Sequence, residues 1–160
     1  MLHALESSRY EATGTYYPSD GGDEGRPLEW HGRARREGSL FVMEGSYRPH
    51  LGAQEYPFYL ELTAEGSAAS GKLYLHCPHL NDATGFFRET ETSVCMAGRA
   101  AGIGATVSLS VVESSHGGLE GNGALVFASG LVWLARFHAV PTQHRATRAD
   151  VVNLRRGGGC

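Results

Sequence analysis

The chain has 160 residues, of which 41% are hydrophobic and 19% are charged, so it is long and apolar enough to fold as one domain around its own core. No apolar run approaches the ~20 residues of a membrane-spanning helix, and the N-terminus lacks the basic and apolar regions of a secretion signal, so we expect a cytoplasmic protein without a membrane partner. Residues 1–142 carry 10 of the 14 basic and 16 of the 17 acidic residues, so the body of the chain has a net charge of −6. This acidic body argues against nucleic-acid binding through the fold, because phosphate contacts need clustered cations.

Alternation of apolar and polar residues with a period of two runs through most of the chain and indicates β-strands. The alternation is clearest at 27–36, 56–65 and 103–113, where one face is apolar and the other polar, as in an antiparallel sheet. Segment 131–140 is apolar on both faces apart from Arg136 and His138, so we expect it to be a more central strand or one covered on both faces. In chain order, we expect strands at residues 9–17, 27–36, 39–48, 56–65, 70–77, 86–97, 103–113, 121–128 and 131–140.

Turn sequences rich in Gly, Ser and Asp separate these strands, and no segment shows a convincing helical period. Short strands in succession form a meander, which must remove its exposed edges by closing. We therefore expect an all-β, antiparallel meander that closes into a barrel or sandwich of about nine strands, with little helix. Residues 1–142 would form a single β domain, and residues 143–160 a basic, Gly-ended C-terminal tail.

Polar and aromatic residues on the expected strands would line a small-molecule site if they faced the interior of a barrel. Barrels of about eight strands have room for one small ligand. A lipocalin-like barrel that binds or rearranges a small hydrophobic molecule is therefore one interpretation of the chain. The alternative is that the polar members of the set face solvent, which is the commoner arrangement. The candidate ligand-binding residues are Trp30, Tyr59, Tyr74, His76, Trp133, Arg136 and His138.

The segment His76-Cys77-Pro78-His79 offers side chains that bind zinc, and a chain turn at Pro78 would let His76 and His79 point at one metal ion. The alternative is a strand end with exposed histidines and a core cysteine. No C-x-x-C or H-E-x-x-H motif supports a metal and no G-x-S-x-G motif supports a nucleophile. We therefore expect no cofactor and favour a protein that is not an enzyme. Cys77 and Cys95 lie in expected strands, where a free cysteine is usually a small core hydrophobe.

The tail ends in Leu154-Arg155-Arg156-Gly157-Gly158-Gly159-Cys160 and is basic, with four arginines against one aspartate after Thr142. This end resembles the exposed Leu-Arg-…-Gly-Gly end of ubiquitin-like modifiers. The resemblance covers about ten residues and implies a processed Gly-Gly terminus through which the chain would be attached to other proteins. Glycines suit such a role because they let an extended tail thread a narrow active-site channel.

The combination of an acidic body, a basic tail and no catalytic motif favours a non-enzymatic binding or assembly module. We expect it to contact a protein partner, or a neighbouring copy in a homo-oligomer, through Arg155, Arg156, Gly157, Gly158, Gly159 and Cys160. The lipocalin-like barrel with a small hydrophobic ligand and the ubiquitin-like modifier are the two alternatives.

Overall fold

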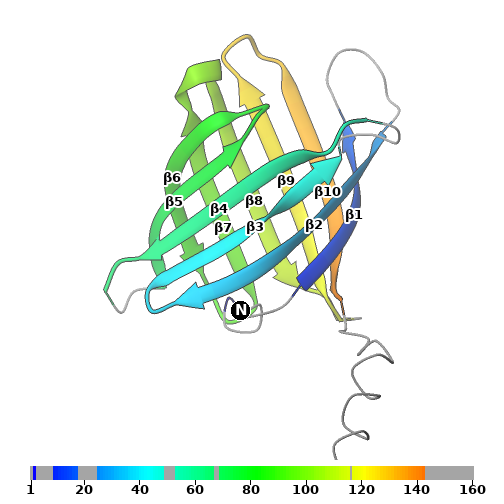
Figure 1. Cartoon of the computed structure of the whole chain (residues 1–160). Helices are drawn as coiled ribbons and strands as arrows, with labels where there is room; N and C mark the ends of the chain where they lie inside the picture. The colour runs from blue at the N-terminus through cyan, green and yellow to red at the C-terminus, as the bar shows by residue number, and fades with distance from the viewer. Residues whose placement is uncertain are drawn as a thin grey trace, which may run out of the picture.

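The computed structural model describes residue 2 and residues 9–17, 25–48, 53–66, 69–115 and 117–142. Ten antiparallel strands, each paired with the next along the chain, form a closed barrel (Figure 1). The 3-10 turn η2 (Ala101–Ile103) joins two of them. The described residues contain no helix that is long and apolar enough to cross a membrane. The strands are β1 (Arg9–Tyr17), β2 (Arg26–Glu37), β3 (Leu40–Arg48), β4 (Tyr56–Ala64), β5 (Ser70–Cys77), β6 (Asn81–Glu89), β7 (Ser93–Ala100), β8 (Ala105–Glu113), β9 (Leu119–Phe127) and β10 (Val132–Pro141).

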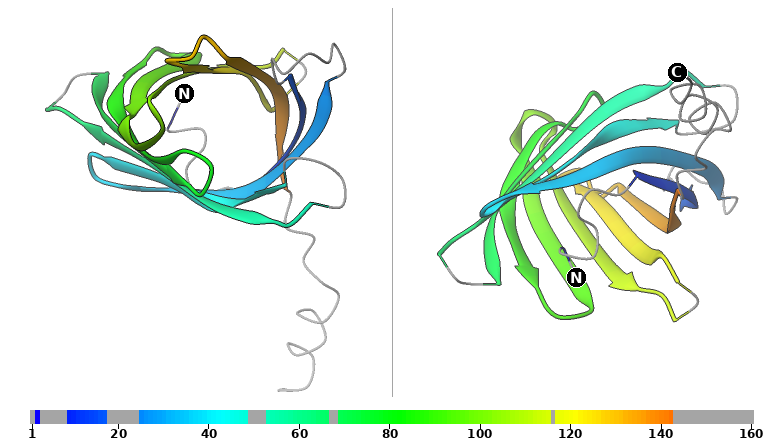
Figure 2. Two further views of the ribbon diagram at one scale, coloured as in Figure 1. Left: turned by 90° about the horizontal axis from the view of Figure 1, so that it is seen from above. Right: turned by 60° about the horizontal axis from the view of Figure 1, so that its bottom comes forward.

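The barrel closes where the first strand meets the last. β1 and β10 pair antiparallel from Tyr10 opposite Pro141 to Tyr17 opposite Leu134. Seen from above, the strands run around a single ring (Figure 2, left). Because every described strand has a neighbour on both sides, no row of backbone donors and acceptors is left at an edge.

The prediction of an all-β antiparallel meander closing into a barrel is confirmed, with ten strands in place of about nine. The extra strand arises because the expected strand at 86–97 is a hairpin, β6 and β7, with its turn at Thr90 to Ser93. The Thr90 backbone N–H donates to the Ser93 carbonyl at 2.8 Å, and the Ser93 N–H donates to Thr90 Oγ1 at 3.0 Å. A hydroxyl side chain closes this turn without Gly or Pro, which are the strongest turn signals in a sequence.

Side chains alternate between the inside and the outside of the barrel along each strand. The apolar faces expected at 27–36, 56–65 and 103–113 all point inward, with residues such as Ala34, Leu62 and Val111 buried. The expectation that 131–140 is a more central strand, or one covered on both faces, was wrong. Leu134 and Val140 point outward and are 50% and 43% exposed, because in a closed ring no strand is more central than another.

The buried core lies mainly toward the lower end of the barrel in Figure 1, which carries the β2–β3, β4–β5, β6–β7 and β8–β9 hairpins. Leu2 is part of this core, and its backbone N–H donates to Glu89 Oε1 at 2.7 Å, at the lower end of β6. Leu2 therefore adds to a layer of buried apolar side chains at this end of the barrel. The core cluster consists of Leu2, Tyr10, Ala12, Ala34, Phe41, Leu60, Leu62, Leu73, Phe87, Val94, Met96, Val111, Leu119 and Ala139.

Inward-facing glycines allow neighbouring strands to approach and bend around the ring. A Cβ atom added at Gly45 would lie 2.0 Å from the His31 carbonyl oxygen on β2. One added at Gly85 would lie 2.0 Å from the Ala97 carbonyl oxygen on β7. Both obstacles are backbone atoms that cannot rotate away, so these positions require glycine, as at the bends of other curved sheets.

We predict that Gly85→Ala lowers the free energy of unfolding by about 1–3 kcal/mol, because the added methyl group forces the β6 and β7 backbones apart. Gly123→Ala is the matched control, since Gly123 also faces inward but its added Cβ would lie 3.5 Å from the nearest atom. This control should be neutral or gain up to about 1 kcal/mol. Urea unfolding followed by circular dichroism measures both, and equal stabilities of the two variants would contradict the close-approach account.

Candidate functional site

The barrel encloses a cavity of about 590 Å³. Its walls are made by inward-facing side chains from strands all around the ring, among them Trp30, Phe58, Leu75, Leu109 and Phe137. The size lies within the roughly 300–1,000 Å³ of pockets that hold drug-sized molecules. The interior of this barrel is therefore large enough for one small ligand.

The cavity is hollow because inward-facing side chains in the upper part of the barrel do not meet across it. Leu62 and Val94, in the packed layer, are each 1% exposed. Trp30, Met43 and Phe58 also point inward, yet they remain only half-buried. Protein cores are normally packed without voids larger than a water molecule. Apolar surface left uncovered inside a barrel indicates a binding cavity.

Polar groups gather at the upper end of the cavity. The Tyr47 hydroxyl is hydrogen-bonded to Nδ1 of His79, and the Tyr56 ring lies with its centroid 4.5 Å from the His79 ring and 5.8 Å from the Tyr47 ring. Tyr47, Tyr56, Cys77 and His79 all line the cavity. We call these four residues the upper cluster.

Strand register and one turn bring the upper cluster together. The β3–β4 register places Tyr47 directly opposite Tyr56. Cys77 ends β5, and the turn from Cys77 to Leu80 is closed by a hydrogen bond of 3.0 Å from the Leu80 N–H to the Cys77 carbonyl. Pro78 sits at the second position of this turn, where its fixed φ is favourable. The turn carries His79 to the end of the cavity.

The surroundings of the upper cluster disfavour negative charge. Burial raises the pKa of the Tyr47 phenol far above its ordinary value, and the neighbouring Cys77 adds to the shift. Burial also raises the pKa of the Cys77 thiol, although hydrogen bonds from the Leu80 backbone and the Tyr47 side chain oppose the shift. Both groups are therefore neutral near pH 7 and act as hydrogen-bonding groups.

The cavity wall carries little formal charge. Among the described residues that line it there is no aspartate or glutamate, and Arg26 is the one lysine or arginine. Arg26 is exposed and already has an interaction partner. The described lining can therefore hold an apolar molecule and offer hydrogen bonds at one end.

Of the candidate ligand-binding residues, Trp30 and Trp133 line the cavity. The other five, Tyr59, Tyr74, His76, Arg136 and His138, point outward, because each lies one residue out of phase with the inward row of its strand. They cannot contact a molecule inside the barrel.

Three of these outward residues join a polar network on the surface of β4, β5 and β6. The Tyr59 hydroxyl donates to Glu61 at 2.9 Å. The Tyr74 hydroxyl and His76 Nδ1 lie 2.9 Å and 2.6 Å from Asp82 Oδ1. The hydrogen bond from His76 lowers the pKa of Asp82, and the hydrogen bond from Tyr74 lowers it further. The contacts of this network are those of a solvated sheet face.

The two remaining outward residues lie on β10. Arg136 and His138 border a shallow polar hollow on the outer face of β1, β9 and β10. His138 Nε2 lies 3.3 Å from the Gly117 carbonyl oxygen.

The structure does not bring His76 and His79 to one point. His76 meets Asp82 on the outer face, whereas His79 meets Tyr47 at the cavity end. No group of three or more His, Cys, Asp or Glu side chains within the described ranges is placed to hold a metal ion.

The two strand cysteines have different surroundings. Cys77 is buried, as expected, but Cys95 is exposed, and the expectation that it belongs to the core was wrong. Val94 and Met96 occupy the inward positions on either side of it, so the alternation of β7 turns Cys95 outward toward Ser110.

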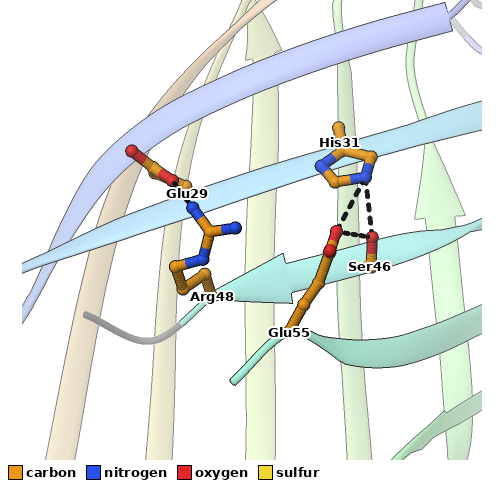
Figure 3. Close-up of polar contacts among 5 residues, drawn as sticks. All are labelled: Glu29, His31, Ser46, Arg48 and Glu55. Atoms are coloured by element: carbon orange, nitrogen blue, oxygen red, sulfur yellow. Dashed lines mark hydrogen bonds and ion pairs between the residues drawn. The ribbon is translucent and has the colours of Figure 1, made fainter. Parts of the chain in front are cut away.

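A serine, a histidine and a glutamate meet on the outer face of β2 and β3 (Figure 3). Ser46 Oγ lies 2.7 Å from His31 Nε2, and Glu55 Oε1 lies 2.9 Å from the same ring nitrogen. A catalytic triad needs the acid on one ring nitrogen and the serine on the other. Because both partners share Nε2 here, the cluster is a surface network, beside the ion pair of Arg48 with Glu29 at 2.8 Å.

Tyr47 and Tyr56 were missed by sequence reasoning. Each continues an inward row of its strand: Tyr47 follows Met43 and Gly45, and Tyr56 precedes Phe58. Extending the period-two alternation to the strand ends would have placed both tyrosines inside.

The tail residues Arg155 to Cys160, and with them the expected partner contact, lie outside the described residues and remain a sequence prediction.

Comparison with known proteins finds a distant likeness in structure and none in sequence. The chain matches no protein-family profile, and no curated protein is significantly similar to it in sequence. A solved structure with a similar chain path is a redesigned β-barrel, mFAP1, bound to DFHBI, with 8% sequence identity and a TM-score of 0.40 over 86% of this chain and 96% of that one. This likeness is too distant to indicate what the present chain binds.

We predict that iodoacetamide alkylates Cys95 several-fold faster than Cys77 at pH 8, because only the thiolate reacts and burial raises the pKa of Cys77. Raising the pH should increase the alkylation rate of Cys77, since its thiolate forms at a higher pH than that of an ordinary cysteine. Peptide mass spectrometry after timed quenching measures each site, with urea-unfolded protein as the control. Equal alkylation rates of Cys95 and Cys77 in the folded protein would contradict the conclusion that the Cys77 thiol is buried and neutral.

Proposed function

We propose that this protein is a β-barrel binding module that holds one small, largely apolar molecule inside the barrel. The observation that supports the proposal most strongly is the cavity of about 590 Å³ walled by apolar side chains. The buried apolar layer toward its lower end and the polar groups at its upper end give a ligand one direction in which to lie.

The energetics favour an apolar occupant. Uncovered apolar surface inside the barrel contributes roughly 25 cal/mol per Å² when a ligand removes it from water. The wall offers few hydrogen-bonding side chains, so a strongly polar molecule would lose its hydration without compensation. An apolar molecule gains the free energy of burial and has no hydrogen bonds to water to lose.

The proposal is tested with N-phenyl-1-naphthylamine, a neutral apolar dye whose fluorescence rises when it leaves water. We predict saturable binding of one dye per chain and a higher melting temperature in its presence, since a ligand that binds only the folded state stabilises it. Ala135→Trp, which places an indole in the cavity, should weaken binding about tenfold or more, because displacing only ~60 Å² of buried ligand surface costs ~1.5 kcal/mol.

The matched control is Ala97→Trp, an alanine of β7 that points outward and is exposed. It adds the same indole outside the barrel and should leave dye affinity unchanged. Circular dichroism and urea unfolding establish that both variants fold. Equal loss of binding in the two variants, or dye binding that does not saturate, would contradict a site inside the barrel.

A further inference from the structure

The upper cluster contains one hydroxyl group, that of Tyr56, that is not hydrogen-bonded to any of the described residues. The Tyr47 hydroxyl is occupied by His79 Nδ1. The Tyr56 hydroxyl makes no hydrogen bond to any of the described residues, although its ring packs against those of Tyr47 and His79. A phenol hydroxyl can donate one hydrogen bond. Tyr56 therefore has a donor available at the end of an otherwise apolar cavity.

The ligand's charge can be argued from what surrounds the cavity. A cationic ligand would need a carboxylate, and no aspartate or glutamate is among the described lining residues. An anionic ligand would need a free cation, whereas Arg26 is already engaged and His79 is hydrogen-bonded to Tyr47 through Nδ1. Burial raises the pKa of both Tyr47 and Cys77, so this end of the cavity also disfavours a carboxylate. A neutral molecule meets none of these penalties.

Resting on the proposed function, we propose that the cavity selects a neutral, largely apolar molecule with a carbonyl oxygen, and that Tyr56 donates a hydrogen bond to this oxygen. The apolar part of the molecule then extends toward the packed layer at the lower end, between aromatic side chains such as Trp30 and Phe58. A carbonyl fits because it accepts a hydrogen bond and carries no charge.

The ring contacts hold Tyr56 in place for this role. The Tyr56 and His79 rings meet edge-to-face with an interplanar angle of 70°, and Tyr47 packs against both rings while it is hydrogen-bonded to His79. Aromatic contacts of this geometry are favourable and fix ring orientation. Replacing Tyr56 by phenylalanine removes the hydroxyl alone and keeps the ring.

The test compares two probes of nearly equal shape: the fluorescent ketone 6-propionyl-2-(dimethylamino)naphthalene and its analogue with a propyl group in place of the propionyl group. Tyr56→Phe should lower the affinity for the ketone about two- to tenfold relative to the affinity for the propyl analogue, the range expected for one net hydrogen bond. In the same variant the emission of the bound ketone should shift to shorter wavelength, because its carbonyl has lost a donor.

Tyr59→Phe is the matched control, since it removes a tyrosine hydroxyl bonded to Glu61 on the outer face. It should leave both affinities and the emission unchanged. Tight binding of both probes with the same ratio of affinities in the wild type and in Tyr56→Phe would overturn the inference and leave the proposed function intact. Failure of the wild type to bind either probe would overturn both. Tighter binding of the corresponding naphthoate at pH 7 than of the ketone would overturn the assignment of a neutral ligand.

Discussion

Pairing between β1 and β10 is the constraint on which the rest of this structure depends. It joins strands more than a hundred residues apart and turns a meander into a ring. Once the ring is closed, every second side chain must point into a shared interior, whether or not that interior can be filled. Leu2, Leu62 and Val94 fill the lower end, but ten strands enclose more space than the upper side chains cover. The cavity is therefore a consequence of closure with this number of strands and with glycine at several inward positions.

The chemistry of the interior follows from the same alternation. Inward rows are apolar along most of their length, and each strand end that reaches the upper cluster carries a group able to hydrogen-bond. The outer face keeps the charged side chains, as in the pairs of Arg35 with Glu44 and Arg48 with Glu29. Because the polar groups of the cavity are concentrated at one end, the barrel distinguishes the two ends of a molecule that it holds.

Much of the fold could be predicted from the sequence, because period-two alternation is a local signal that survives in a single chain. The row of Phe58 and Leu60 was correctly assigned to one face, and closure followed from the need to cover strand edges.

The same alternation was not applied to Tyr59 and His76, which were grouped with Trp30 and Trp133 although their phase turns them outward. The hairpin at Thr90 was missed because a threonine hydroxyl closes it. The upper cluster depends on the β3–β4 register and on the Pro78 turn, which bring together residues about thirty positions apart, and no local pattern reports such a distance.

The central claim is that the interior is hollow and apolar, and xenon tests it most directly, since this atom enters empty apolar cavities and has no preference for the protein surface. The measurement is a crystal structure of the protein under xenon pressure. We predict xenon inside the ring, above the packed layer of Leu62 and Val94 and in contact with Trp30 or Phe58. An interior without xenon, in which the upper side chains have moved into contact with one another, would contradict the account.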